Sequence, residues 1–114
     1  MNHGQKGRKF GRMTKQRKEL LRDLARALIL NNKINTTQAK AKSLRPYIEK
    51  LVTKAKNKSL ASNRLLTSEL GYSSAKKLTK EIVDKFSERK GGYTRVINLP
   101  PRLSDGSKMA IIEF

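Results

Sequence analysis

Most residues of this chain that could do chemistry are cations, and they are densest at its start. Residues 1–18 hold seven lysines and arginines, three glycines and no acidic residue. A segment this polar cannot bury enough apolar surface to fold by itself, and its like charges repel one another. Cations on a phosphate backbone release condensed counterions, so RNA or DNA is the natural ligand. The candidate contacts of this basic arm are His3, Lys6, Arg8, Lys9 and Arg12.

A second group of cations lies on two expected helices, at residues 14–31 and 37–57. Apolar residues repeat with helical period along one side of each helix, which leaves another side for charge. On these basic faces lie Lys15, Lys18, Arg22 and Arg26 in the first helix, and Lys40, Lys42 and Arg45 in the second.

The third group is the segment 89–95, RKGGYTR. Its two glycines let the backbone approach a phosphate closely and donate N–H groups to it. Arg89, Lys90 and Arg95 supply charge, and an arginine can bind phosphate through two parallel hydrogen bonds. Tyr93 either stacks on a base or packs on the core.

Each group also has a purely structural interpretation, as a tail without function or as ordinary solvated surface. The charge distribution favours nucleic acid instead. Residues 1–58 hold 17 cations and three acids, a net of +14, whereas residues 59–114 hold ten and six, a net of +4. No helix–turn–helix, zinc finger or basic zipper is evident, and the charge is spread over several elements. This pattern suits RNA of irregular shape better than base-specific reading of DNA.

Catalysis and metal binding find little support in the sequence. His3 is the only histidine, and no second ligand of the kind that a zinc site needs accompanies it. Glu81, Asp84 and Glu88 recur on one expected helix, but lysines stand four residues on either side of Glu81, which favours a salt-bridged, solvated face. No phosphate loop, nucleophile or dinucleotide motif occurs. We therefore expect no enzymatic activity, no cofactor and no metal.

The elements that must position these cations form one domain at residues 14–114, preceded by the arm at residues 1–13. We expect helices at residues 14–31, 37–57, 60–70 and 74–87, and strands at 33–36, 93–99 and 109–114. Asn31 and Asn32 can end the first helix in left-handed geometry, and Gly71 ends the third. Pro46 lies inside the second helical stripe, which keeps its phase, so one kinked helix is favoured over two.

Composition excludes several other classes of protein. The chain has no cysteine, so disulfides and cysteine-bearing zinc sites are excluded. No apolar run approaches the roughly 18–20 residues of a membrane span, and no signal-peptide core follows Met1. A transit peptide is an alternative for the basic start, but its glycines and the acids of the following helix argue against it.

Several short stretches resemble, in order and spacing, the bacterial-type large-subunit ribosomal protein L17 family over essentially the whole chain. GGYTRV at residues 91–96 is the most specific of them. The others are NHG at 2–4 with Gly7-Arg8, LRDLA at 21–25, INTT at 34–37, KAK at 40–42, EKLVT at 49–53 with Ala55-Lys56, NR at 63–64, DG at 105–106, MA at 109–110 and IE at 112–113. Through the NR stretch, Arg64 joins the candidate RNA contacts.

The resemblance implies an α+β fold with four helices and a small mixed three-stranded sheet. It also implies a structural protein of the cytoplasmic ribosome that binds 23S rRNA near the exit of the nascent-peptide tunnel. Neighbouring large-subunit proteins would be its other partners. Asn2, Leu65 and the short loop at residues 104–108 depart from the family pattern, so contacts there are less secure.

Two readings from other classes remain open on the residues alone. A nucleoid-type protein would coat DNA with little sequence preference, and preference for folded ribosomal RNA over an equally long DNA duplex separates it from a ribosomal protein. An RNA-modifying enzyme would need a cofactor site that the sequence does not contain.

We predict that deletion of residues 1–13 leaves the folded core intact and weakens RNA binding. Each lost phosphate contact removes nearly one unit from the slope of log affinity against log salt, so the salt dependence flattens. Titration of 23S rRNA at several salt concentrations measures that slope. An unchanged slope would show that the arm makes no phosphate contacts.

Overall fold

The computed structural model describes residues 14–114, so the expected basic arm lies outside the described residues. In chain order the elements are α1 (Thr14–Asn31), β1 (Lys33–Thr37), α2 (Gln38–Asn57), α3 (Leu60–Leu70), α4 (Tyr72–Lys77), the π-helical turn η1 (Leu78–Ile82), α5 (Val83–Lys85), β2 (Arg95–Leu99) and β3 (Met109–Glu113). Because α4, η1 and α5 are continuous, the described chain has four helical segments and three strands, which confirms the predicted α+β class.

Local sequence explains most of the helix boundaries. The α1 helix ends where Asn32 takes a φ of 66°, with its N–H donating to the carbonyl of Leu28 at 2.7 Å. Thr37 caps α2 by accepting the N–H of Lys40 at 3.3 Å, which satisfies one of the free donors at a helix start. Pro46 lies inside α2, which is assigned as one helix, as the unbroken stripe predicts.

The fourth helical segment departs from the prediction of residues 74–87. It begins at Tyr72, directly after Gly71, whose φ of 83° lets the chain change direction and start a new helix at once. It also contains the π turn, where Thr79 Oγ1 donates to the carbonyls of Ala75 at 3.0 Å and Lys76 at 3.1 Å. The π turn could not be predicted from the sequence, because a search for apolar residues with a period of 3.6 does not detect a single turn of different pitch.

The sheet has the strand order β1-β3-β2, and both pairings are antiparallel. The expectation of a mixed sheet is therefore wrong. β1 and β2 run in the same direction, but β3 returns from the hairpin and lies between them, so they never pair with each other. Ile112 of β3 stands opposite Ile34 on one side and Val96 on the other, and it is fully buried.

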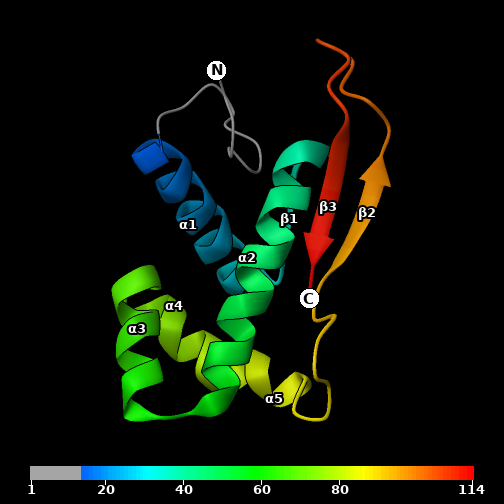
Figure 1. Ribbon diagram of the computed structural model, residues 1–114. Helices are drawn as coiled ribbons and strands as arrows, with labels where there is room; N and C mark the ends of the chain where they lie inside the picture. Colours follow the sequence, from blue (N-terminus) through cyan, green and yellow to red (C-terminus); the bar gives the residue numbers. More distant parts are fainter. Residues whose placement is uncertain (1–13) are drawn as a thin grey trace, which may run out of the picture.

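The hydrophobic core centres on α2, which lies between the other helices and the sheet (Figure 1). Leu44 and Ile48 of α2 are fully buried with Leu28 of α1, Leu66 of α3 and Ile112 of β3. The buried stripe fixes the orientation of α2 about its axis. Its opposite side therefore points in a defined direction, and this side carries cations.

Candidate nucleic-acid interface

The segment 89–95 lies beside α2, and together they border a groove of about 640 Å³. Four cations line it: Arg45 from α2, Lys85 from the end of α5, and Arg89 and Arg95 from the segment itself. No aspartate or glutamate is among the lining residues. The fold thus brings together cations that are up to 50 positions apart in the sequence, and joins part of the second predicted group to the third.

Tyr93 fixes this segment to the body of the protein. Its side chain is only 2% exposed, and its ring lies 5.5 Å from that of Phe86 between centroids. Lys56 of α2 donates to the Tyr93 hydroxyl at 3.3 Å and also to the carbonyl of Arg89. Of the two interpretations of Tyr93, the structure shows packing on the core.

Glu49 of α2 makes the second attachment. Its Oε2 accepts the hydroxyl of Thr94 at 2.9 Å and lies 3.4 Å from Nε of Arg45, one helical turn earlier. Gly92 turns the backbone with a φ of 64°, in the left-handed region that glycine adopts without strain. The two glycines thus shape a loop whose following residues, Tyr93 and Thr94, are both held by α2.

A second hollow of about 500 Å³ lies between α2 and the first half of the same loop, at Lys90 and Gly91. Lys50 and Lys54 of α2 and Lys90 and Gly91 of the loop line it with Pro46. Lys50 and Lys54 were not among the predicted contacts. Their spacing from the buried stripe of α2 could have identified them, because both fall on its solvent side. We call the combined set the loop–helix surface: Arg45, Lys50, Lys54, Lys85, Arg89, Lys90 and Arg95.

The arginines of this surface have internal partners but keep free donors. Arg95 donates from Nε to Glu113 at 3.0 Å, and its side chain is 73% exposed. Arg45 is 51% exposed beside Glu49. A guanidinium has five N–H donors, and exposed ion pairs contribute only about 0–1 kcal/mol. A phosphate can therefore bind these groups at little cost to the fold.

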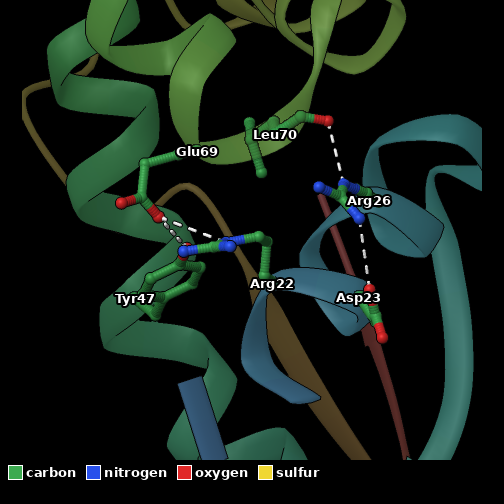
Figure 2. A network of polar contacts seen from close by, with 6 residues as sticks. All are labelled: Arg22, Asp23, Arg26, Tyr47, Glu69 and Leu70. Carbon is green, nitrogen blue, oxygen red and sulfur yellow. Dashed lines mark hydrogen bonds and ion pairs between the residues drawn. The ribbon is translucent and has the colours of Figure 1, made fainter. Parts of the chain in front are cut away.

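The basic face of α1 divides into two parts. Lys15 and Lys18 are exposed, as predicted. Arg22 instead points at α3, where its Nε lies 3.8 Å from Oε2 of Glu69 (Figure 2). Arg26 donates from Nε to the carbonyl of Leu70 at 2.9 Å. The free cationic face therefore ends at Lys18, because one turn later α1 packs against the end of α3 and its arginines hold that junction.

The remaining predicted contacts are more dispersed. Lys42 and Arg64 are exposed, and Lys40 is half-buried at the start of α2. None of the three lines the groove or the second hollow. His3, Lys6, Arg8, Lys9 and Arg12 lie outside the described residues.

Residues 14–114 contain no candidate cluster of metal ligands. No group of three or more histidine, aspartate or glutamate side chains there could hold a metal ion.

The prediction of salt bridges from Glu81 to the lysines four residues away on either side is wrong. Lys77 donates to the carbonyl of Leu30 at 2.8 Å instead, and the π turn alters the i, i+4 alignment. Asp84 lies 3.8 Å from Lys58 instead. No helix in this part of the chain is long and apolar enough to cross a membrane.

Tyr47 completes the junction of α1, α2 and α3 (Figure 2). Its hydroxyl donates to Oε2 of Glu69 at 2.7 Å. Burial, followed by this bond to a carboxylate, raises the pKa of Tyr47 to about 12. Both causes favour the neutral phenol, because the phenolate would lose its solvation and face the negative charge of Glu69.

Comparison with known proteins places this geometry in context. Residues 20–114 match the family of ribosomal protein L17. The large ribosomal subunit protein bL17 of Nautilia profundicola is 47% identical over 119 residues, which cover 100% of this chain and 98% of the relative. Its counterpart in Shouchella clausii is 46% identical over 115 residues, covering 93% of this chain and 96% of the relative. Its counterpart in Akkermansia muciniphila is 48% identical and covers 100% and 85%, respectively.

We predict that Tyr47→Phe lowers the free energy of unfolding by roughly 1.5–3 kcal/mol near neutral pH, because it removes one hydrogen bond to a charged group. The raised pKa adds a pH signature. Above pH 10 the unfolded chain loses the Tyr47 proton while the folded chain keeps it, so this contribution falls as pH rises toward about 12. The difference in unfolding free energy between wild type and variant, from urea titrations at several pH values, should therefore shrink over that window.

Tyr72→Phe, at a side chain that is 69% exposed, is the matched control. It should change neither the free energy of unfolding nor its dependence on pH. A pH-independent difference for Tyr47→Phe would contradict the assignment.

Proposed function

The chain belongs to the ribosomal protein L17 family, and we propose that, as a structural constituent of the large ribosomal subunit, it binds 23S rRNA near the exit of the polypeptide tunnel. The family is not enzymatic, and its members act in the cytoplasm as parts of the ribosome. The binding would be phosphate neutralisation combined with shape matching, with no bond made or broken.

The loop–helix surface is the observation that carries this proposal. It gathers seven cations from α2, α5 and the segment 89–95, and the loop itself is anchored by Tyr93 and Thr94. A pre-positioned loop loses little conformational freedom when RNA binds, so more of the counterion release appears as affinity. The exposed N–H groups around Gly91 and Gly92 add donors that approach a phosphate without steric hindrance.

The basic arm and the exposed lysines of α1 extend the proposed contact area. The arm, with His3, Lys6, Arg8, Lys9 and Arg12, would follow the RNA away from the body, and Lys15 and Lys18 would continue the charge onto α1. Lys40, Lys42 and Arg64 would contact phosphates at the margins. Neighbouring large-subunit proteins would pack on exposed apolar side chains such as Leu60, Leu65 and Leu103, which are 65%, 55% and 103% exposed.

The alternative is a nucleoid-type protein that coats duplex DNA. A straight duplex offers a regular array of phosphates. The loop–helix surface instead consists of two separate hollows, one on each side of the loop, and therefore suits an irregular RNA better. Competition between folded 23S rRNA and an equally long DNA duplex distinguishes the two. Equal affinity for both would favour the nucleoid-type protein.

We predict that replacing Arg89 and Arg95 together by glutamine reduces the slope of log affinity against log salt by roughly two, or nearly one per lost phosphate contact. The measurement is a filter-binding titration with 23S rRNA between low and moderate salt.

The matched control for this pair is Arg102→Gln. Arg102 is also an exposed arginine beside a single carboxylate, 3.4 Å from Asp105, but it lies in the hairpin loop and lines neither hollow. We expect its slope to equal that of the wild type. If Arg102→Gln lowers the slope by as much per arginine removed as the double variant does, the binding depends on net charge alone and the loop–helix surface is not the interface.

A further inference from the structure

A hollow of about 240 Å³ lies between α3 and the helical segment of α4 and η1. Tyr72 and Lys76 line it from α4, Thr79 and Lys80 from η1, and Asn63 from α3. None of these side chains belongs to the loop–helix surface. In Figure 1, α3 and α4 lie on the opposite side of α2 from β2, so the hollow is a separate place on the molecule.

Tyr72 differs from the other two tyrosines of the chain. Tyr47 and Tyr93 are held by hydrogen bonds in packed surroundings, whereas the side chain of Tyr72 is 69% exposed. Its ring lies 5.8 Å from Nζ of Lys76. The fold therefore gains little from this aromatic ring, which remains available to a ligand.

The cations beside the ring follow from helical spacing. Tyr72 and Lys76 lie one turn apart on α4, and Lys80 of the following π turn lines the same hollow. No carboxylate is among the lining residues. An aromatic face followed by two ammonium groups suits a flat base whose backbone carries phosphates.

The other lining residues are three polar ones, Asn63, Thr67 and Thr79, and the apolar Ala75. The hydroxyl of Thr79 is occupied by the carbonyls of Ala75 and Lys76, which stabilises the π turn. Asn63 is exposed, so its side-chain amide offers a donor and an acceptor to a base edge. Single π turns inside helices occur often at functional sites.

We propose that this hollow binds one unpaired nucleotide of the RNA, with its base stacked on Tyr72 and its flanking phosphates on Lys76 and Lys80. The size supports a single base, because pockets for drug-sized ligands begin at about 300 Å³. The inference rests on the proposed function, since the nucleotide belongs to the RNA that the protein binds. It adds a second contact of a different kind, made by stacking as well as by charge.

The test compares three variants at position 72 in the full chain, each titrated with protein-free 23S rRNA. Tyr72→Phe keeps the aromatic face and should bind within about twofold of wild type. Tyr72→Ala should lose roughly fivefold or more, as stacked aromatics do when truncated. Tyr72→Leu keeps apolar bulk without the aromatic face and should behave like Tyr72→Ala.

Three results would overturn the proposal. If Tyr72→Ala binds like wild type, the hollow makes no contact with RNA. If Tyr72→Leu binds like Tyr72→Phe, the residue acts as an apolar contact of the kind that another protein would use. In both cases the binding by wild type still supports the proposed function. If wild type itself fails to bind 23S rRNA, both proposals fall.

A second measurement does not depend on affinity. The chain has no tryptophan, so Tyr72→Trp introduces a single fluorescent reporter. A short single-stranded RNA should quench it strongly, and an RNA duplex of the same length should quench it much less. Leu65→Trp, at an exposed side chain of α3 that does not line the hollow, is the matched control and should respond weakly to both RNAs. Equal quenching by strand and duplex would overturn the assignment to an unpaired nucleotide.

Discussion

Repulsion among cations is the constraint that this fold has to satisfy. The chain carries 27 lysines and arginines against nine acids, an excess that opposes compaction. Within residues 14–114, six different carboxylates pair with cations, and three of these pairs join separate parts of the chain. Glu69 connects α3 to α1, Glu113 connects β3 to β2, and Asp84 connects α5 to the residue after α2. With so many acids at internal junctions, Glu49 is the one aspartate or glutamate of residues 14–114 that lines either hollow of the loop–helix surface.

The α2 helix connects this charge arrangement to the core. Its buried stripe orients the helix, and its other side holds the segment 89–95 through Lys56 and Glu49. Lys56 is a cation with a structural role, since it donates to Tyr93 and to the carbonyl of Arg89. The position of Arg89 thus depends on the packing of α2, and Arg95 is held in addition by its pairing with Glu113 of β3.

Much of the fold could be predicted from the sequence because its signals are local. Helical periodicity and capping residues gave α1 and α3 with their observed ends, and Asn32 takes the left-handed geometry expected of it. The π turn and the pairing of the sheet could not be predicted this way, since one is a change of pitch and the other depends on distant residues. For the site, residue type indicated which side chains carry charge but not what they face. Residue type alone therefore predicts Arg22 as an RNA contact and leaves Tyr93 open between a base and the core, whereas in the structure Arg22 faces Glu69 and Tyr93 lies in the core.

The most direct test of this account is lysine footprinting by mass spectrometry, comparing the free protein with purified large ribosomal subunits. Lys50, Lys54, Lys85 and Lys90 are all exposed in the described structure, so each should react readily with an acetylating reagent in the free protein. The account predicts that all four are protected in the subunit, because RNA phosphates cover the loop–helix surface. Equal reactivity of these lysines in both states would show that this surface faces solvent in the ribosome, and would contradict the account.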